Sequence, residues 1–480
     1  MNAERKHRIL GLIVAACSVI LSGIFVYILI DTKMLTWQLL AIIGAVLAGA
    51  AVGIWALARD SRKRIRSIIA IALAVVLLGV ETAGSYYVLL AKKTLEDITE
   101  PVVDVTEIGI YVRTDDAAKI LADTGDYVFG ILEVQDRKAT DTALKDLATT
   151  FGKEPTVQEF ADIEALMDAL LTEKTVDAIV VSKAFLDILE EIEGHQSDLE
   201  KIREIHEVLD ENEQQPDTPG TNKDVFSIYI SGIDCRGRIS KRSRSDVNII
   251  ATVNVKTGQI LLVSTPRDYF VPLTISNGVE DKLTNAGIYG VEVSKGTLGM
   301  LYDIEIDYYF RVNFDGFEGI IDALGGITVN SQYAFKTYSY SFSKGENELN
   351  GKAALEFARE RYSFAGGDRQ RGKNQMEVIR AVIDKMVSPA FLANYKETMD
   401  SISGTFQTSM PYEMIAELVQ NQLSNGTKWN VTTYSADGKG KYRKPYSQKS
   451  NSYVMIPTQK TVDRAKELMA QVINGEIPQV

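Results

Sequence analysis

The chain has 480 residues, enough for more than one domain, and it carries a formal net charge of −12 at pH 7. An acidic chain is a poor general binder of nucleic acid, because that binding depends on neutralising phosphates with basic side chains. The two cysteines and three histidines are scattered, which excludes a disulfide framework and argues against a Ser-His-Asp mechanism.

Three apolar runs predict three transmembrane helices at the N-terminus. They are Ile9–Ile30, Trp37–Leu57 and Ile68–Leu90, and each has about twenty residues, the length with which a helix crosses a bilayer. Basic residues precede the first run and separate the second from the third, whereas the turn between the first and second runs carries only one basic residue, Lys33. The positive-inside rule then places the N-terminus in the cytoplasm. We therefore predict a plasma-membrane anchor over residues 1–92, with the large C-terminal part extracellular.

Glu81 interrupts the third apolar run. An ionisable side chain is costly in hydrocarbon, so it needs a partner or a position away from lipid. Either Glu81 faces the other helices, which we favour, or the third helix is shifted and shorter.

Residues 103–215 predict an accessory domain of the α/β class, because short β-type runs alternate with helical patterns. The predicted strands are Glu107–Val112, Tyr127–Leu132 and Ala178–Val181, and the predicted helices are Ala117–Ala122, Thr142–Thr149, Val157–Leu171 and the acidic segment Ile202–Glu213. The Pro/Gly/Thr segment Gln214–Asn222 predicts a linker. We find no catalytic constellation in this domain, which could guide an acceptor or position its neighbour.

The third region, 223–480, gathers charged residues at the ends of predicted strands. The strands are Val225–Ile233, Asp246–Val255 and Gln259–Ser264, and the charges at their ends are Asp234, Asp246, Arg267 and Asp268. A basic loop lies between the first two strands, and a second arginine cluster, Arg359, Arg361, Arg369 and Arg371, follows later. One cluster would most simply be a solvated surface, but two on an acidic chain indicate a shared polyanion. Carboxylates and guanidiniums in this setting suit a divalent metal and a polyphosphate.

Further elements complete this region. We predict a strand at Tyr308–Asn313, a helix at Phe314–Leu324, a strand at Ile327–Val329, a loop at Phe342–Glu348, a helix ending near Glu360 and a helix from about Gln375 to Met386. Arg359 and Arg361 can serve one ligand only if the helix ends there, because residues two apart on a helix point in different directions. The C-terminal segment predicts helices at Tyr412–Leu423 and Thr461–Val472, a strand at Trp429–Tyr434 and a basic surface loop at Gly438–Lys449.

The order of several motifs between Asp224 and Met386 resembles the LytR–CpsA–Psr family. The eight matching pieces are Gly232 to Asp234, Arg244 to Asp246, Ser264 to Asp268, Asp281 to Asn285, Val312 to Phe317, Asp322 to Gly326, Leu349 to Ala353 continued to Arg359-Glu360-Arg361, and Asp368 to Gln375. Each piece is weak alone, but their order is specific. The three-span anchor and the extra domain are similar to capsule-type members in particular.

The resemblance implies a catalytic domain over 223–480, with a central mixed sheet flanked by helices around a lipid pocket. It implies transfer of a glycan phosphate, here capsular polysaccharide, from a polyprenyl (di)phosphate carrier onto peptidoglycan. Asp234 and Asp246 match the carboxylates that bind the metal, Mg²⁺ or alternatively Mn²⁺. Arg244, Arg267, Arg359, Arg361 and Arg371, with Gln375, match positions that hold the diphosphate. Asp268 or a metal ligand could act as base for the acceptor hydroxyl.

One motif departs from the family pattern. Many members have Arg-x-x-Arg-Gln at the positions of Arg371 to Gln375, and in this chain Asn374 stands in place of the second arginine. Whether Lys373 or Arg369 compensates for the lost positive charge is left open. Two other functions are weighed: a non-catalytic, polyprenyl-phosphate-binding regulator or scaffold of capsule assembly, and a membrane-bound transcription regulator. The second is disfavoured, because the basic N-terminal tail is too short for a DNA-binding domain.

Overall fold

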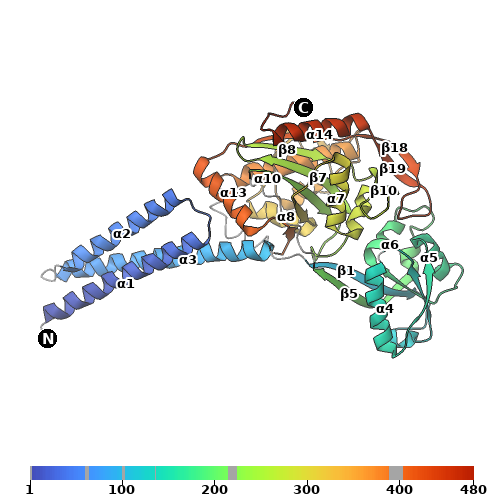
Figure 1. The fold of residues 1–480 in the computed structure, drawn as a ribbon, viewed down its shortest axis with the longest axis horizontal. Helices are drawn as coiled ribbons and strands as arrows, with labels where there is room; N and C mark the ends of the chain where they lie inside the picture. Colours follow the sequence, from blue (N-terminus) through green and yellow to red (C-terminus); the bar gives the residue numbers. More distant parts are fainter. Residues whose placement is uncertain (1–2, 60–63, 100–102, 136, 214–223, 389–403) are drawn as a thin grey trace. The chain divides into compact units, whose positions relative to one another are not determined.

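The computed structural model describes residues 3–59, 64–99, 103–135, 137–213, 224–388 and 404–480. The chain divides into two compact units (Figure 1). One unit comprises residues 1–99, 395–403 and 410–428, and the other comprises residues 100–394, 404–409 and 429–480. The predicted boundaries 1–92, 103–215 and 223–480 remain predictions.

Three long helices make up most of the first unit: α1 (Ala3–Asp31), α2 (Trp37–Arg59) and α3 (Arg64–Thr99). Each contains a segment long and apolar enough to span a membrane, namely Ile13–Asp31, Trp37–Arg59 and Ile65–Leu90. The prediction of three apolar spans is therefore confirmed. Glu81 on α3 is only 3 % exposed and accepts a hydrogen bond from the Ser22 hydroxyl on α1. It thus faces the neighbouring helices, as we favoured.

A helix from the distal part of the chain packs onto the turn between α1 and α2. This helix, α13 (Tyr412–Asn425), begins with Tyr412, whose hydroxyl donates to the backbone oxygen of Thr32 at 2.7 Å. Further along α13, the Gln420 side chain donates to the backbone oxygen of Leu35 at 2.8 Å. The Lys92 ammonium on α3 binds Asp31 at the end of α1. The turn, α13 and the C-terminal part of α3 therefore lie at the same end of the bundle.

The second unit contains a five-stranded sheet with the order β3-β2-β4-β1-β5. Its strands are β1 (Val103–Arg113), β2 (Val128–Leu132), β3 (Thr156–Phe160), β4 (Ala178–Ser182) and β5 (Ile202–Glu213). One hydrophobic core joins a face of this sheet to α4 (Arg137–Phe151), and another joins the opposite face to α5 (Ile163–Leu171) and α6 (Lys183–Leu189) (Figure 1). We call these residues, 103–213, the accessory domain, and they form the predicted α/β layer structure.

Three helices predicted in the accessory domain are wrong or only partly right. Ile202–Glu213 is strand β5, because it pairs antiparallel along the whole of β1, from Val103 opposite Glu213 to Arg113 opposite Ile202. Such a long ladder overrides a helical spacing of apolar residues. The segment Val157–Leu171 divides into β3 and α5, and Asp162 caps α5 by accepting from Ala165 N at 2.9 Å. Ala117–Ala122 contains only the start of a 3₁₀ turn. The linker Gln214–Asn222 lies outside the described residues.

A six-stranded mixed sheet forms the centre of the larger domain, with the order β16-β11-β6-β7-β8-β17. The strands are β6 (Val225–Ile233), β7 (Ser245–Asn254), β8 (Gln259–Ser264), β11 (Tyr308–Val312), β16 (Phe406–Thr408) and β17 (Asn430–Ser435). The pairs β6–β11 and β8–β17 are parallel, and the remaining pairs are antiparallel. The predicted central mixed sheet is confirmed, and five of its strands, β6, β7, β8, β11 and β17, agree with the prediction to within about a residue.

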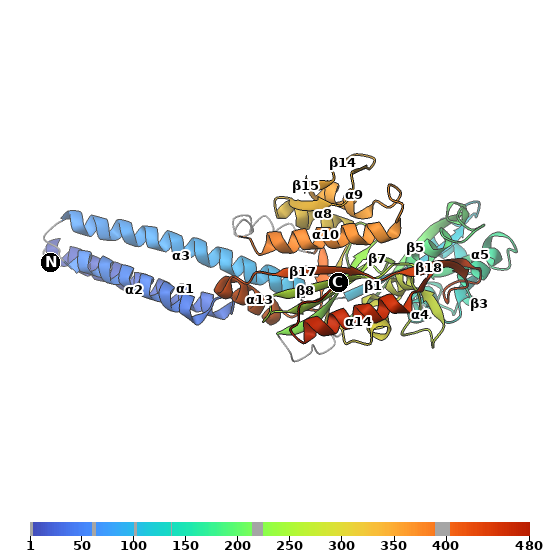
Figure 2. The ribbon, with the colours of Figure 1, turned by 90° about the horizontal axis from the view of Figure 1, so that it is seen from above.

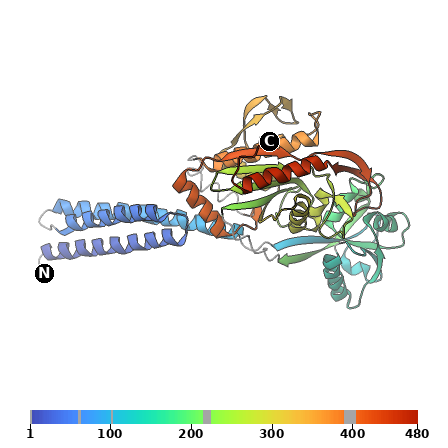
Figure 3. The ribbon, with the colours of Figure 1, turned by 45° about the horizontal axis from the view of Figure 1, so that its top comes forward.

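Helices cover both faces of this sheet (Figure 2). On one face, α7 (Val291–Tyr302) and α14 (Gln459–Ile473) share a core with β6, β7 and β8. On the other face lies α10 (Asp368–Met386), which also packs against α8 (Phe314–Ala323) and α9 (Gly351–Arg359). The short strands β12 (Ile327–Ser331), β13 (Phe335–Lys336), β14 (Ser341–Phe342) and β15 (Gly345–Leu349) stand beside α9 and α10 on this side (Figure 3).

Two predicted loops contain strands. Phe342–Glu348 carries the end of β14 and most of β15, which pairs with β12. Gly438–Lys449 begins with β18 (Gly438–Arg443), which pairs with β19 (Ser452–Pro457). The remaining small elements are β9 (Phe270–Pro272), β10 (Glu280–Lys282) and a 3₁₀ helix at Leu283–Tyr289.

Helix α10 begins earlier than predicted, at Asp368 rather than near Gln375. Gly367, with φ of 50°, precedes its first residue, so the chain turns and enters the helix directly. Arg371 and Gln375 are therefore both helical and lie one turn apart, on the same face of α10.

The accessory domain is joined to the larger domain by backbone hydrogen bonds and a buried ion pair. Val105 N on β1 donates to the Ser240 backbone oxygen at 2.9 Å, and Arg242 N donates to the Val105 oxygen at 3.3 Å. The Arg311 guanidinium on β11 donates to Asp104 at 2.9 Å, and these side chains are 2 % and 0 % exposed. This attachment holds β1 against the basic loop between β6 and β7.

Candidate functional site

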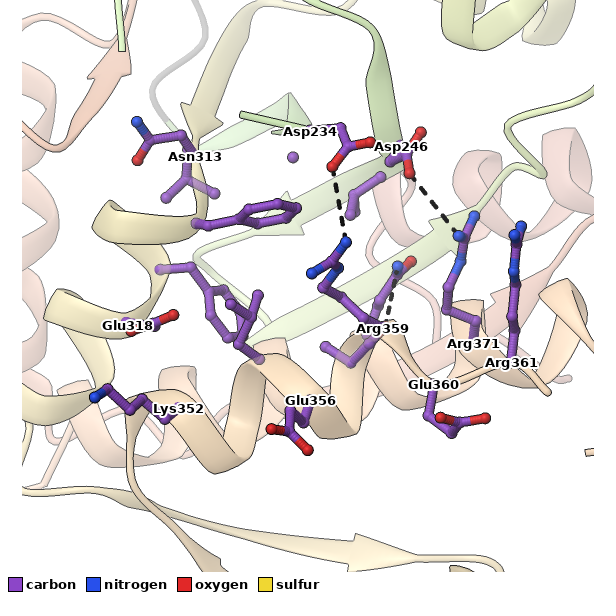
Figure 4. A pocket seen from close by; sticks show the side chains of 18 of the residues that line it. Asp234, Asp246, Asn313, Glu318, Lys352, Glu356, Arg359, Glu360, Arg361 and Arg371 are labelled. Atoms are coloured by element: carbon purple, nitrogen blue, oxygen red, sulfur yellow. Dashed lines mark hydrogen bonds and ion pairs between the residues drawn. The ribbon is translucent and has the colours of Figure 1, made fainter. Parts of the chain in front are cut away.

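A cavity of about 940 Å³ lies between the central sheet and helices α8, α9 and α10 (Figure 4). Much of its wall is apolar and comes from both the strands and the helices: Ile230, Val247, Val312, Phe314, Phe317, Leu355, Ala358 and Ile379. Gly232 also lines it, and a Cβ there would lie 2.6 Å from the Val247 side chain. The absence of a side chain at Gly232 therefore lets β6 and β7 approach closely at this point.

Asp246, at the start of β7, is held by arginines at the charged part of the cavity. Arg267 Nη1 donates to both carboxylate oxygens of Asp246, at 2.9 and 3.0 Å, and Arg371 Nη1 lies 3.9 Å from one of them. Burial alone would raise the pKa of Asp246, but Arg267 and Arg371 outweigh it and hold the pKa below its usual value. Asp246 is therefore ionised at neutral pH.

Asp234 follows β6 and faces Arg359, whose Nη2 lies 3.9 Å from Asp234 Oδ1. The Arg359 guanidinium also lies over the ring of Phe314, 4.3 Å from its centroid, which fixes its orientation. Figure 4 shows Asp234 and Asp246 pointing from the sheet toward Arg359 and Arg371 on the helices. The carboxylates and guanidiniums thus meet across one space.

The end of α9 explains how Arg359 and Arg361 reach the same cavity. The helix ends at Arg359, and the next residue, Glu360, is already extended with ψ of 129°. The predicted helix end is confirmed, and both arginines line the cavity. Arg361 Nη2 donates to the Tyr362 hydroxyl at 2.7 Å, and within the described ranges it has no carboxylate partner.

Two further predicted residues come from α10. Arg371 pairs with Asp368 one turn earlier at 2.5 Å, and Gln375 Nε2 donates to the backbone oxygen of Ala358 at 3.4 Å. Both line the cavity. The structure therefore brings together Asp234, Asp246, Arg267, Arg359, Arg361, Arg371 and Gln375.

Arg244 and Asp268 do not line this cavity. Arg244 turns toward the accessory domain, where its Nη1 donates to Glu191 Oε1 at 2.9 Å. Asp268 lies behind Arg267, with its carboxyl oxygen 4.0 Å from Arg267 Nε. Burial raises the pKa of Asp268 above its usual value, although Arg267 opposes the shift. Asp268 is therefore the more readily protonated of the two carboxyl groups beside Arg267.

The structure also shows where the residues around the motif that differs from the family pattern lie. Asn374 is 3 % exposed and lies between α9 and α10, where it accepts from Gln370 Nε2 at 2.9 Å. Lys373 is exposed, and Arg369 pairs with Asp437. None of these three residues lines the 940 Å³ cavity, so none supplies the missing positive charge to its wall.

Sequence analysis missed two contributors to the site. Phe314 supports Arg359, and its position in the motif from Asn313 to Phe317 could have indicated it. Glu191 binds Arg244 from another domain, and no pattern in the sequence links these residues.

The two carboxylates suit a divalent cation. Among the residues that the structure describes, no group of three or more His, Cys, Asp and Glu side chains forms a metal site. However, Mg²⁺ commonly uses one or two protein carboxylates and completes its octahedron with phosphate oxygens and water. Each carboxylate has about four acceptor positions, so the bonds that Asp246 accepts from Arg267 leave room for an ion. Asp234 and Asp246 fit such a site.

The model of the LytR_cpsA_psr family matches residues 193–471, more than half of the chain. The chain belongs to the LytR_cpsA_psr family. This confirms the family resemblance seen in the motifs. The match begins after Glu191, so the membrane helices and most of the accessory domain precede the part shared with the LytR_cpsA_psr family.

Named relatives include the polyisoprenyl-teichoic acid–peptidoglycan teichoic acid transferases TagU of Bacillus subtilis and Oceanobacillus iheyensis. Each is 31 % identical to this chain over 77 % of its own length. The matched part is 50 % of this chain for the B. subtilis protein and 54 % for the O. iheyensis protein. The crystal structure of B. subtilis TagV is 29 % identical over 53 % of this chain and 99 % of TagV, with a TM-score of 0.45.

Proposed function

We propose that this chain is a membrane-anchored, metal-dependent transferase that moves a glycan phosphate from a polyprenyl diphosphate carrier onto peptidoglycan at the outer face of the membrane. We further propose that the glycan is capsular polysaccharide, because the three-span anchor and the accessory domain resemble the streptococcal capsule protein CpsA. The observation that carries the proposal is an apolar cavity whose charged part gathers arginines from α9, α10 and the end of β8.

The shape and chemistry of the cavity support a lipid diphosphate as donor. Apolar side chains along the wall would bury hydrocarbon, which is favourable in proportion to the area removed from water. Guanidiniums bind phosphate through paired hydrogen bonds and keep their charge at all physiological pH values. Arg361 is suited to this task, because among the described residues no carboxylate competes for it.

In the proposed reaction, an acceptor hydroxyl attacks the phosphorus that bears the glycan. The bond between that phosphorus and the bridging oxygen breaks, polyprenyl monophosphate leaves, and the hydroxyl proton passes to a base. Arg359, Arg361 and Arg371 would bind the diphosphate oxygens, and Arg267 would be kept in place by Asp246. Charge neutralisation and positioning are what phosphoryl transfer chiefly requires. Asp268 or one of the proposed metal ligands, Asp234 and Asp246, would receive the proton.

Asp234 and Asp246 would hold the proposed Mg²⁺, with Mn²⁺ as the alternative. When bound, the ion would neutralise charge on the diphosphate. The requirement for metal is tested by removing divalent ions with a chelator and restoring Mg²⁺ or Mn²⁺ one at a time.

The bundle supports placement of the catalytic residues outside the cell. The basic N-terminal tail and the basic segment between α2 and α3 are expected to be cytoplasmic. The α1–α2 turn and the C-terminal part of α3 lie at the same end, because Lys92 binds Asp31. With α3 crossing toward this end, the part of the chain after the anchor would be outside the cell.

The test is a transfer assay with the purified full-length protein in detergent or nanodiscs. A polyprenyl-diphosphate-linked glycan, a peptidoglycan fragment and Mg²⁺ are supplied, and glycan attached to peptidoglycan is measured. We expect transfer in the wild type and none after Arg361→Ala and Arg371→Ala together. Binding of the lipid without transfer in any metal would favour the regulator or scaffold instead. Failure to bind the lipid would refute both functions.

A further inference from the structure

A second, small cavity adjoins the charged part of the large one. Its volume is about 10 Å³, which is about what a single water molecule needs. Asp246, Arg267, Arg371 and Gln375 line both cavities. The rest of the small cavity's wall comes from the ends of β8 and β17 and from the start of α10. The charged residues therefore belong to two cavities at once.

The two cavities lie over different strands of the central sheet. The large cavity is lined by Val312, Ile230 and Val247, from β11, β6 and β7. The small cavity is lined by Ser264 and Ser435, from β8 and β17. Because the order in the sheet is β11-β6-β7-β8-β17, the small cavity lies beyond the large one, toward β17. The charged residues that both cavities share thus stand between them.

The hairpin of β18 and β19 adjoins the small cavity. Arg369, which lines that cavity, donates through Nη2 to the backbone oxygen of Gly438 at 2.9 Å. The backbone nitrogen of Met455 on β19 donates to the backbone oxygen of Asp268 at 2.7 Å, one residue after Arg267. These bonds hold one end of the hairpin beside the charged residues.

The accessory domain holds the other end of the hairpin. The Glu164 carboxylate, in the first turn of α5, accepts from the backbone nitrogens of Lys449 at 2.7 Å and Ser450 at 2.8 Å. Gln135 Nε2 donates to the backbone oxygen of Tyr446 at 3.1 Å. Both Glu164 and Gln135 are buried. The segment that joins β18 to β19 is therefore fixed, and so is the hairpin as a whole.

Two exposed tyrosines lie side by side on this hairpin. Tyr442 and Tyr453 are directly opposite in the β18–β19 ladder, their ring centroids are 6.2 Å apart, and they are 68 % and 44 % exposed. Gly440 leaves space for the second ring, since a Cβ there would lie 2.7 Å from the Tyr453 hydroxyl. Burial raises the pKa of Tyr453, and the nearby charges of Asp268 and Asp368 add to the rise. Tyr453 is thus close to the small cavity, which Asp368 lines.

Basic side chains alternate along β18 with this tyrosine pair. They are exposed, and among the residues that the structure describes none of them pairs with a carboxylate: Lys439, Lys441 and Arg443, with Lys444 after the strand. Aromatic rings offer a rigid apolar face on which the C–H face of a sugar ring can pack. A cationic surface attracts carboxylates. The hairpin therefore suits a glycan that carries acidic groups.

We propose that the β18–β19 hairpin is the docking surface for the acceptor, a peptidoglycan strand whose peptide stems carry carboxylates. Sugar rings would lie on Tyr442 and Tyr453, and the carboxylates would meet the basic side chains of β18. In phosphoryl transfer the attacking and leaving oxygens lie roughly in line. With the polyprenyl chain in the large cavity, the acceptor hydroxyl would approach from the opposite side, where the small cavity and the hairpin lie. The inference rests on the proposed function in taking peptidoglycan as the acceptor.

The experiment measures KM for each substrate in the transfer assay, with a soluble peptidoglycan fragment as acceptor. We expect Tyr442→Ala and Tyr453→Ala together to raise KM for the acceptor about tenfold, because exposed tyrosines at the centre of an interface contribute that much, and to leave KM for the lipid donor unchanged. Replacing both by phenylalanine should preserve KM, since packing needs the ring and not the hydroxyl. Tyr333→Ala is the matched control, because Tyr333 is 47 % exposed and lines neither cavity.

A second set of variants does not depend on the tyrosines. Lys439→Gln and Lys441→Gln together should raise KM for the acceptor about threefold at low salt and by less at high salt, because salt screens exposed charges. The same variants should not change KM for an acceptor whose peptide carboxylates are amidated. Both substitutions are at exposed positions, so folding is expected to be unaffected.

A titration of each protein with the peptidoglycan fragment, which needs no turnover, separates this inference from the proposed function. Binding that the alanine variants weaken, in a wild type that transfers no glycan, would support the docking surface and remove the proposed activity. An acceptor KM that is unchanged in both sets of variants would overturn the docking surface and leave the transferase intact. A rise in KM for the donor alone, or a loss of vesicle binding alone, would overturn it too, in favour of the donor glycan or the membrane surface.

Discussion

Asp246→Asn tests the charge arrangement of the site. The substitution keeps the shape of the side chain but removes the charge that Arg267 and Arg371 face. Asparagine is the better choice, because alanine would leave the Arg267 guanidinium, which is only 14 % exposed, without its carboxylate and with an empty space beside it.

The cost to stability follows from the burial of the pair. Removing one partner of a fully buried ion pair costs about 3–5 kcal/mol. The Asp246 side chain is 21 % exposed, Arg267 keeps Asp268 within 4.0 Å, and the asparagine oxygen still accepts one hydrogen bond. We therefore expect a loss of about 2 kcal/mol, which lowers the melting temperature by several degrees and leaves the protein folded at 25 °C.

The pH dependence has a definite sign. The folded-state pKa of Asp246 is depressed, so its pair contributes stability above the usual aspartate pKa of 3.8 and loses it as the pH falls through the folded value. The difference in unfolding free energy between wild type and Asp246→Asn should thus be full at pH 7 and shrink below about pH 4. Thermal or denaturant unfolding at several pH values measures this difference.

Transfer activity should fall by about 10²–10³-fold in Asp246→Asn, because Asp246 keeps Arg267 in place and would hold the proposed ion, and losing one group that stabilises developing charge usually costs that much. The assay is glycan transfer from the lipid diphosphate at saturating Mg²⁺. Glu467→Gln is the control, because Glu467 is an exposed, ion-paired carboxylate on α14 away from the cavity. Wild-type turnover in a folded Asp246→Asn variant would refute the assignment of Asp246 to the site.

Three further predictions concern the cavity wall, the buried pair and the base. Val312→Trp should fill part of the cavity and weaken polyprenyl diphosphate binding about tenfold without weakening pyrophosphate binding; equal losses for both ligands in a binding assay would contradict a lipid pocket. Asp104→Ala should destabilise the protein by about 3 kcal/mol in denaturant unfolding, since it leaves the buried Arg311 guanidinium without its carboxylate. Asp115→Ala, at an exposed position, should cost under about 0.5 kcal/mol, and equal effects of the two substitutions would argue against a buried pair. If Asp268 is the base, turnover should rise with pH through a pKa above 3.8, because burial favours its protonated form, and Asp268→Asn should abolish that limb; a limb that persists in the variant assigns the base elsewhere.

Much of the central sheet followed from local patterns. The strands β6 and β8 have the bounds expected from runs of Val, Ile and Leu, because a strand buried on both faces has an almost continuous apolar sequence. The end of α9 at Arg359 was also predictable, from the need for two arginines to serve one ligand. The order of motifs, rather than any single motif, predicted which charges would meet.

The errors arose where distant segments decide the local structure. β5 carries apolar residues at helical spacing and becomes a strand only because β1 offers a long unpaired edge. Arg244 was expected at the diphosphate together with the other arginines, but the structure pairs it with Glu191, a residue of the accessory domain that follows α6. A sequence pattern does not reveal such a partner, since the two residues are connected only through the tertiary fold.

The attachment of β1 to the basic loop has a consequence for genetic experiments. A strain in which residues 103–213 are deleted would lose the backbone partners of Ser240 and Arg242, and Arg311 would lose its carboxylate. Loss of the proposed transfer in that strain would report the collapse of the neighbouring domain and not the task of the deleted one. Charge-neutral substitutions confined to the accessory domain's outer surface, with the ladder left whole, are the changes whose phenotypes can be attributed to that domain.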